Sequence, residues 1–190
     1  MINVEKNVLS KDLFNTLAKE INDKSFPWYF YSDVEQEWER KYKDIKSNFT
    51  FKSTYQFVHS FILNSKHNSP FFKELHIQLI QEIFKKFNIS KGSIQRSKIN
   101  LTLNNNSDTN TFNIPHVDYE VLGNNSKRKT IILYLNNSDG DTIIFNEKYG
   151  DNLKEFTLQR RITPVENSAV IFDTKYYHTG QNPIKYKKRL

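Results

Sequence analysis

The chain has 190 residues, of which 37% are hydrophobic, 26% charged and 14% aromatic. This composition excludes a disordered tail, a collagen-like repeat and a disulfide scaffold. Because the chain contains no cysteine, thiol catalysis, cysteine-ligated zinc and iron–sulfur clusters are excluded as well. The formal charge of +7 comes mostly from lysines spread along the chain, a pattern that favours a solvated surface over a nucleic-acid interface.

The length suits a single domain over residues 1–190. No apolar run approaches the roughly 18 residues that a membrane-spanning helix needs. The start of the chain mixes charged residues throughout and lacks the apolar stretch of a secretory signal. We therefore expect a soluble, cytoplasmic protein without a membrane partner.

Residues 1–92 are predicted to form a mainly helical support region. Ser10 can cap a first helix, and Ser69 followed by Pro70 is a typical start for a second. Between these helices, Phe26–Tyr31 is expected to be a short strand or loop packed on the core, and Thr54–Leu63 is apolar without a clear period. Both predicted helices have apolar residues at spacings of three and four, namely Leu13, Phe14, Leu17, Ala18 and Ile21 in the first, and Phe72, Leu75, Leu79, Ile80, Ile83, Phe84 and Phe87 in the second.

After Gly92 the apolar pattern changes to a period of two, which is typical of strands. Short strands at regular spacing favour an antiparallel sandwich or a jelly roll. Helices followed by strands favour helices packed on one outer face, so we predict an α+β fold whose core occupies residues 93–190. The expected strands are Ile94–Leu103, Thr130–Leu135, Thr142–Phe145, Phe156–Ile162 and Ala169–Phe172.

His116 and Asp118 form a His-x-Asp motif in this strand-rich half. Residues two apart on a strand point to the same face, so the imidazole and the carboxylate would lie side by side. His178, on a later strand, can complete a set of two histidines and one carboxylate, which suits non-haem Fe(II) that reacts with oxygen. The motif alone is a weak signal, because a loop histidine beside an acid has the same spacing. Arg189 follows near the next expected strand, where a guanidinium can bind a carboxylate through two parallel hydrogen bonds.

The other histidines are expected to have structural roles. His76 lies beside the apolar stripe of the second predicted helix, and His67 lies in a polar loop. His59 falls in an aromatic stretch, where core packing is the favoured role and a contact with substrate is the alternative.

From about Ile94 onward the sequence resembles the Fe(II)- and 2-oxoglutarate-dependent oxygenases, particularly the prolyl-4-hydroxylase-like branch and its relatives in marine phages. Such a resemblance implies a double-stranded β-helix, a cupin-like jelly roll, with the N-terminal helices packed on one face. The matching segments occur in the family's order and are Pro115–Tyr119, Thr130–Asn136, Gly140–Phe145, Pro164–Phe172, Tyr176–Gly180 and Lys187–Leu190.

The resemblance implies that His116, Asp118 and His178 bind Fe(II) and that Arg189 binds the distal carboxylate of 2-oxoglutarate. It also implies that 2-oxoglutarate is decarboxylated to succinate while a substrate C–H bond is hydroxylated with O2. Ascorbate is a further cofactor that the resemblance allows.

Three more residues are implied around the co-substrate. Tyr134 would donate a hydrogen bond to the same carboxylate as the arginine, with a core aromatic as the alternative role. Thr142 and Asn100 would line the site, although small polar residues on strands also satisfy backbone groups. The family's tyrosine shortly before His-x-Asp is missing from Asn104–Asn113, and the sequence ends at Leu190, where the family has a further core strand.

A prolyl, peptide or amino-acid-like substrate, or another small molecule, is expected from the resemblance. A nucleic acid is less favoured, because the basic charge is diffuse and no base-clamping element is recognisable. The alternatives are a catalytically silent jelly-roll binding module, a nucleic-acid-directed oxygenase of the same family, and another metal enzyme on a cupin-like barrel. A phage-encoded protein would act in the host cytoplasm, and the sequence does not indicate an oligomeric state.

Overall fold

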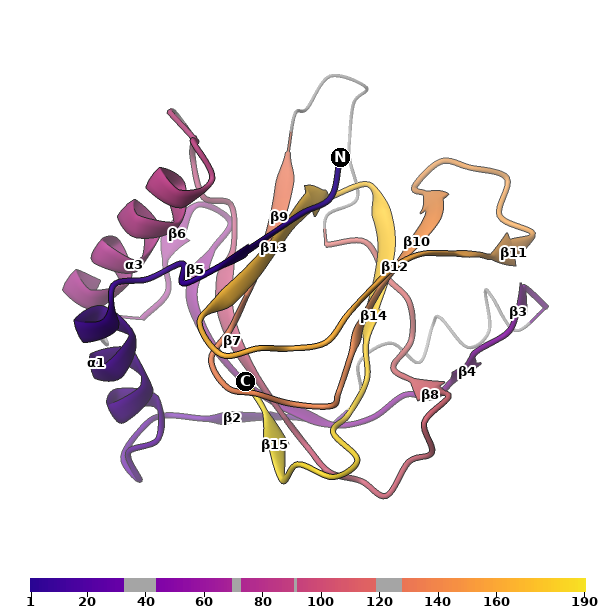
Figure 1. Cartoon of the computed structure of the whole chain (residues 1–190), viewed down its shortest axis with the longest axis horizontal. Helices are drawn as coiled ribbons and strands as arrows, with labels where there is room; N and C mark the ends of the chain where they lie inside the picture. Colours follow the sequence, from indigo (N-terminus) through magenta and orange to yellow (C-terminus); the bar gives the residue numbers. More distant parts are fainter. Residues whose placement is uncertain (33–43, 70–72, 91, 119–127) are drawn as a thin grey trace.

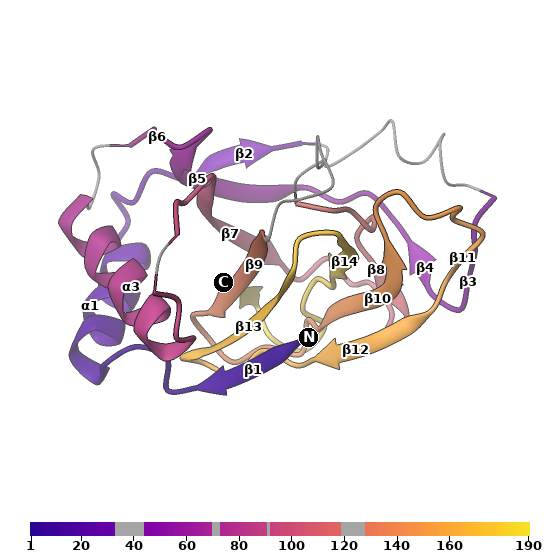
Figure 2. The ribbon, with the colours of Figure 1, turned by 90° about the horizontal axis from the view of Figure 1, so that it is seen from above.

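The computed structural model describes residues 1–32, 44–69, 73–90, 92–118 and 128–190. In this part of the chain, the helices α1 (Lys11–Ile21) and α3 (Lys73–Lys86) lie side by side at one end of the molecule, and strands make up the rest of the regular structure (Figures 1 and 2). Neither of these helices is long and apolar enough to cross a membrane. The strands are β1 (Asn3–Lys6), β2 (Tyr29–Tyr31), β3 (Lys46–Ser47), β4 (Thr50–Phe51), β5 (Gln56–Leu63), β6 (Lys66–His67), β7 (Ser97–Leu103), β8 (Thr111–Phe112), β9 (Lys129–Tyr134), β10 (Thr142–Lys148), β11 (Glu155–Phe156), β12 (Leu158–Ile162), β13 (Ser168–Asp173), β14 (Tyr176–Gly180) and β15 (Lys188–Arg189).

The strands form a larger and a smaller layer. One sheet of the larger layer has the order β15-β7-β5-β2, with β6 also paired to β5, and the other has the order β1-β13-β9. A hydrogen bond of 3.1 Å from the backbone N–H of Leu135 to the carbonyl of Leu190 joins these two sheets. The smaller layer has the order β12-β10-β14 and is extended by a bridge between His116 and His178. All pairings in the two layers are antiparallel, whereas the short pairs β3–β11 and β4–β8 are parallel.

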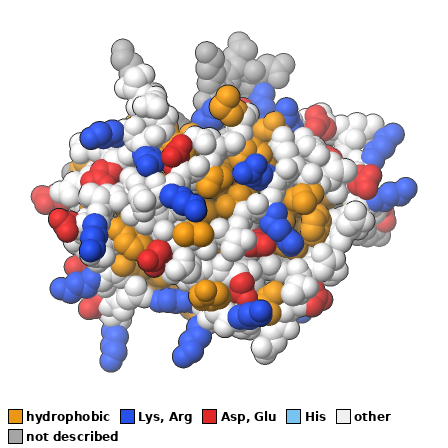
Figure 3. Space-filling model, viewed as in Figure 1, with side chains coloured by type: hydrophobic (Ala, Val, Ile, Leu, Met, Phe, Trp, Pro, Cys, Tyr) orange, Lys and Arg blue, Asp and Glu red, His pale blue; other side chains and the backbone are white. Residues whose placement is uncertain are grey.

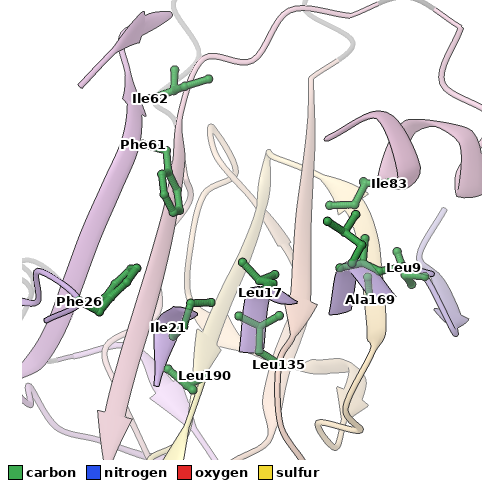
Figure 4. Packing of buried hydrophobic residues seen from close by; sticks show 12 residues of the cluster. Leu9, Leu17, Ile21, Phe26, Phe61, Ile62, Ile83, Leu135, Ala169 and Leu190 are labelled. Atoms are coloured by element: carbon green, nitrogen blue, oxygen red, sulfur yellow. The ribbon is translucent and has the colours of Figure 1, made fainter. Parts of the chain in front are cut away.

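The two helices cover the outer face of the larger layer. Leu13, Leu17 and Ile21 of the predicted stripe of α1 are buried, and Figure 4 shows Leu17 and Ile21 among residues of the strands. Ser10 does not cap α1 with its side chain; its hydroxyl instead donates a 2.8 Å hydrogen bond to Glu82 of α3 and so links the two helices. The buried cluster between helices and sheet is Val8, Leu9, Leu13, Leu17, Ile21, Phe26, Phe61, Ile62, Ile83, Leu135, Ala169 and Leu190.

Side chains alternate between two faces along β7 and β15, and one face is apolar while the other is polar. Ile99, Leu101 and Leu190 pack with the helix-side cluster. Their strand neighbours point to the opposite face, towards the smaller layer, because side chains alternate along a strand. The inward residues of β7 and β15 are therefore polar, and they are Lys98, Asn100, Thr102 and Arg189.

Apolar side chains fill the rest of the space between the layers and cover the far side of the smaller layer. The first cluster consists of Tyr134, Ile144, Ile162, Val170 and Phe172. The second consists of Phe112, Ile143, Phe145, Phe156 and Tyr177, with Phe49 and Phe51 of the segment around β4 packed against it.

The prediction of a mainly helical region over residues 1–92 is wrong for several segments. Gln56–Leu63, which has no clear period, forms β5 and pairs with β7 on one side and β2 on the other. Asn3–Lys6 forms β1 because it pairs with β13, a partner far along the chain. These strands depend on long-range pairing, which a local pattern does not contain. The expected start of the second helix at Pro70 lies outside the described residues.

The aromatic run at Phe26–Tyr31 packs on the core only at its beginning. Phe26 is buried, but Tyr29, Phe30 and Tyr31 of the edge strand β2 are 64%, 60% and 56% exposed. The expectation that this run is core is therefore wrong for its last three residues.

The histidine expectations are confirmed for three residues, with one difference at His67. His67 is exposed as expected, but it lies on the strand β6 and not in a loop, because Lys66–His67 pairs with β5. His59 is buried, with its Nδ1 2.9 Å from the carbonyl of Pro27 and its Nε2 3.1 Å from the hydroxyl of Ser69. His76 is buried with its Nε2 2.8 Å from the hydroxyl of Ser97 and its ring stacked on Phe61.

His76 should make the stability of the protein sensitive to acid. Burial, with a smaller contribution from His67, lowers the pKa of His76 to about 4 from 6.5. A histidine whose pKa is lower in the folded than in the unfolded state binds fewer protons when folded, so stability falls as the pH drops from about 6.5 towards 4. We expect His76→Gln to remove about 2 kcal/mol of the stability difference between pH 7 and pH 5, measured by urea unfolding at both pH values. His67→Gln, at an exposed position, should leave most of that difference, and an unchanged pH dependence in His76→Gln would contradict the assignment.

Candidate metal centre

The backbone places two histidine rings next to each other. The N–H of His116 donates to the carbonyl of His178 and the N–H of His178 to the carbonyl of His116, each at 2.9 Å. This antiparallel bridge brings the ring centroids to 4.5 Å. Asp118 is two residues further along, and one ligand atom from each of the three residues lies within 4.8 Å of the others. The structure thus brings together the three residues that the sequence predicts as metal ligands.

Hydrogen bonds orient both imidazoles towards the carboxylate. Nδ1 of His116 lies 3.3 Å from the carbonyl of Ile114, and Nδ1 of His178 lies 3.1 Å from the carbonyl of Tyr176. A carbonyl only accepts hydrogen bonds, so Nδ1 carries the proton and Nε2 keeps its lone pair. The Nε2 atoms of His116 and His178 lie 3.9 Å from Oδ1 and 3.5 Å from Oδ2 of Asp118, respectively.

The electrostatics keep His116 and Asp118 in the form that binds metal. Burial and the neighbouring His178 lower the pKa of His116 to about 3, so its imidazole is neutral at pH 7. Burial alone would raise the pKa of Asp118, but His178, His116 and Arg96 together hold it well below its usual range. A neutral imidazole at His116 and an ionised carboxylate at Asp118 are the protonation states that a divalent metal requires of these ligands.

A second polar cluster surrounds Arg189. Its Nη2 donates a 2.6 Å hydrogen bond to the hydroxyl of Thr142, and its Nη1 donates to the carbonyl of Gln181 at 3.3 Å. The hydroxyl of Tyr134 donates to the same threonine oxygen at 2.8 Å. Among the described residues no carboxylate forms an ion pair with this half-buried guanidinium. An arginine in such surroundings usually has an anionic partner, so the cluster suits a carboxylate ligand.

Two buried oxygens face the same region. Thr102 is the register partner of Arg189, and Asn100 lies two residues away on the same face of β7. The Oδ1 atom of Asn100 and the Oγ1 atom of Thr102 are buried and make no hydrogen bond within the described part of the chain. Buried polar groups normally have partners, so this face is suited to a polar ligand. Within the described residues, Asn100 forms no hydrogen bond with Arg189, Tyr134 or Thr142, so its predicted role rests on its position alone.

β14 connects the metal-ligand cluster to the arginine cluster. His178 and Gly180 are two residues apart on this strand and point to the same face, about 7 Å from each other along the strand. Gly180 contacts the guanidinium directly, because a Cβ there would collide with Nη1 of Arg189 and lie 3.2 Å from its Cζ. Glycine at this position therefore makes room for the arginine side chain.

Gly180→Ala should displace the guanidinium without unfolding the protein, because the colliding atom is at the end of a flexible side chain. A displacement of about 1 Å can weaken a positioned interaction roughly a hundredfold, so we expect a loss of that order in the affinity for 2-oxoglutarate, the co-substrate that the resemblance implies. Isothermal titration of the Mn(II)-loaded protein with 2-oxoglutarate measures it. Gly92→Ala is the matched control, because a Cβ there meets its neighbours only at 3.5 Å or more. Equal affinity in the two variants would contradict the proposed contact.

Sequence reasoning missed three residues of this region. Arg96 forms an ion pair with Asp118. Gly180 leaves space for the side chain of Arg189. Thr102 is the register partner of Arg189 on the neighbouring strand. The alternation of side chains from Ser97 to Leu103 places Thr102 on the same face of the strand as Asn100, so Thr102 could have been predicted from the sequence. No local signal relates Arg96 to a residue 22 positions away.

Of three comparisons with known proteins, only the comparison with solved structures finds matches. Neither protein-family models nor curated proteins match the sequence. A crystal structure from Burkholderia pseudomallei, described as an oxidoreductase of the 2OG-Fe(II) oxygenase family, matches with a TM-score of 0.63 and 12% identity, covering 99% of this chain and 81% of that one. A prolyl-4-hydroxylase from Pseudomonas putida matches with a TM-score of 0.51 and 14% identity, covering 99% and 87%.

These matches confirm the predicted resemblance at the level of the fold. Both structures come from bacteria, and the likeness to phage members stays a prediction. The chain is mostly β-sheet with two described helices, and it has the fold of solved 2OG-Fe(II) oxygenases over nearly its whole length.

Proposed function

We propose that the chain is an Fe(II)- and 2-oxoglutarate-dependent dioxygenase that hydroxylates a C–H bond. The observation that carries this proposal is that β14 places the two clusters close together, because His178 belongs to one cluster and Gly180 contacts the other. His178 of the metal-ligand set lies two residues along β14 from Gly180, which meets a guanidinium that forms no ion pair with a described carboxylate, although Asp141 lies near enough to act on it electrostatically. An extended five-carbon dicarboxylic acid is of comparable length, so one molecule can reach both clusters.

We further propose that residues 1–190 form one oxygenase domain with a jelly-roll core. The two antiparallel layers, with the histidine bridge on the smaller one and Arg189 on the larger one, support this arrangement. Residues before 93 would support the core through α1, α3 and the strands that extend the larger layer.

The residues fit a ferrous ion. His116 and His178 would bind it through Nε2, which their Nδ1 hydrogen bonds leave free, and Asp118 through a carboxylate oxygen. When bound, Fe(II) supplies the redox chemistry that couples O2 reduction to decarboxylation of the keto acid and oxidation of the substrate. The two-histidine, one-carboxylate set leaves three adjacent positions open for that chemistry.

The residues around Arg189 fit the far end of 2-oxoglutarate. Arg189 would bind the distal carboxylate, and Tyr134 and Thr142 would hold the guanidinium and share in that contact. Burial raises the pKa of Tyr134, so its hydroxyl stays protonated and donates to the oxygen of Thr142, which leaves the hydroxyl proton of Thr142 for the carboxylate. Asn100 would line the same face, O2 would be the second co-substrate, and ascorbate is proposed as an accessory reductant.

A prolyl, peptide or amino-acid-like substrate is proposed on the likeness to the Pseudomonas putida prolyl-4-hydroxylase. A nucleic-acid substrate is disfavoured by the distribution of charge. On the face shown in Figure 3, Lys and Arg side chains are spread among acidic and uncharged ones instead of forming one patch. We also propose a cytoplasmic location, where Fe(II) and 2-oxoglutarate are both available.

Succinate formation tests the proposal. The protein is incubated with Fe(II), ascorbate, O2 and 2-oxoglutarate, with and without proline-containing peptides and free amino acids, and succinate is measured. We expect slow succinate formation with 2-oxoglutarate alone and a faster rate with a substrate of the right class.

Two results would contradict the proposal. Failure of Mn(II) and 2-oxoglutarate to bind would show that the metal assignment is wrong. Tight binding of both without succinate under any condition would favour a catalytically silent binding module.

A further inference from the structure

The carboxylate of Asp118 has different neighbours at its two oxygens. Nη2 of Arg96 donates to Oδ1 in a close ion pair. Oδ1 is also 3.9 Å from Nε2 of His116, whereas Oδ2 lies 3.5 Å from Nε2 of His178. Thus one oxygen is engaged by a guanidinium, and the other faces the more deeply buried histidine.

The backbone next to Arg96 is held firmly by two elements. Ser97, the first residue of β7, is the register partner of Ile62 on β5. Its hydroxyl lies 2.8 Å from Nε2 of the buried His76 on α3, whose ring stacks on Phe61. The residue after Arg96 is therefore anchored to the sheet and to the helix, and the Arg96 side chain reaches Asp118 from the start of β7.

We propose that Arg96 is a positioning residue that makes Asp118 bind metal through Oδ2 alone. This inference rests on the proposed function. A carboxylate that chelates through both oxygens occupies two coordination positions, and with two histidines it leaves only two of six. Engagement of Oδ1 by Arg96 keeps three positions, enough for a two-atom chelate by 2-oxoglutarate and one further ligand. Partners that orient a ligand in this way commonly affect metal affinity by about 10- to 100-fold.

Metal binding and co-substrate binding by Arg96 variants test the inference. Isothermal titration measures the Kd of the apo protein for Mn(II) and then the Kd of the Mn(II)-loaded protein for 2-oxoglutarate. We expect Arg96→Met to raise the Kd for Mn(II) by about 10- to 100-fold and to weaken 2-oxoglutarate binding in addition. Arg96→Lys, which keeps the charge but not the planar fork, should lie between the wild type and Arg96→Met. Arg160→Met, at an exposed position on β12, removes the same charge elsewhere and should match the wild type.

The outcomes separate this inference from the proposed function. If the wild type binds neither Mn(II) nor 2-oxoglutarate, the proposed function itself fails. If the wild type binds both and Arg96→Met binds them equally well or Mn(II) more tightly, Arg96 is not a positioning residue and the proposed function stands. A purely structural role would lower the melting temperature of Arg96→Met and leave both Kd values unchanged at a temperature where it is folded. Should Arg96→Met fail to fold, Arg96→Lys carries the same comparison, and wild-type Kd values in it would overturn the inference.

Discussion

Replacing His178 with alanine is expected to abolish Mn(II) binding and reduce 2-oxoglutarate-dependent succinate formation to the rate without protein. His178 is the most buried of the three ligands and faces Oδ2 of Asp118 at 3.5 Å. Its removal leaves one imidazole and one carboxylate, which cannot hold a divalent ion against water as three ligands do. Isothermal titration with Mn(II) and a succinate assay measure the two effects.

The matched control for this variant is His67→Ala, a histidine exposed on β6. It should bind Mn(II) and form succinate as the wild type does. The backbone bridge between residues 116 and 178 does not involve the imidazole, so His178→Ala should remain folded, which circular dichroism can verify. Undiminished Mn(II) affinity in folded His178→Ala would show that the ion binds elsewhere.

Replacing Arg189 with methionine is expected to remove 2-oxoglutarate binding while leaving Mn(II) binding intact. Loss of one partner from a partly buried, hydrogen-bonded charge pair costs about 2–5 kcal/mol, or roughly thirtyfold to several thousandfold in Kd. Methionine keeps most of the side-chain volume, so the stability of the fold should change little. Titration of the Mn(II)-loaded variant with 2-oxoglutarate gives the Kd.

Two further variants sharpen the test of Arg189. Arg189→Lys keeps a charge but forms no pair of parallel hydrogen bonds, so its Kd should be intermediate. Arg160→Met loses an exposed arginine and should bind 2-oxoglutarate normally. If Arg189→Met binds 2-oxoglutarate as the wild type does, the anion contact assigned to Arg189 is wrong.

The sequence predicted best what local periodicity determines. The stripe of α1 was recognised because one face of the helix meets an apolar cluster, and β10 and β13 were recognised as short apolar runs because both of their faces are buried. The structure extends β10 to Lys148, beyond the predicted end at Phe145, because pairing with β14 continues at Tyr176 after a bulge.

Elements that depend on distant partners were missed. β1 exists because Val4 lies opposite Val170, and β5 because it is hydrogen-bonded on both sides. The same limit applies to the candidate site. His116 and Asp118 were found from their spacing, whereas the contact of Arg96 with Asp118 and the contact of Gly180 with Arg189 follow only from the tertiary fold.

A crystal structure of the protein soaked with Mn(II) and 2-oxoglutarate tests the central claim most directly. We predict one anomalous-scattering peak among His116, Asp118 and His178, with 2-oxoglutarate chelating that ion and its distal carboxylate bound to Arg189. An ion bound elsewhere, or a 2-oxoglutarate molecule that does not reach Arg189, would contradict the account.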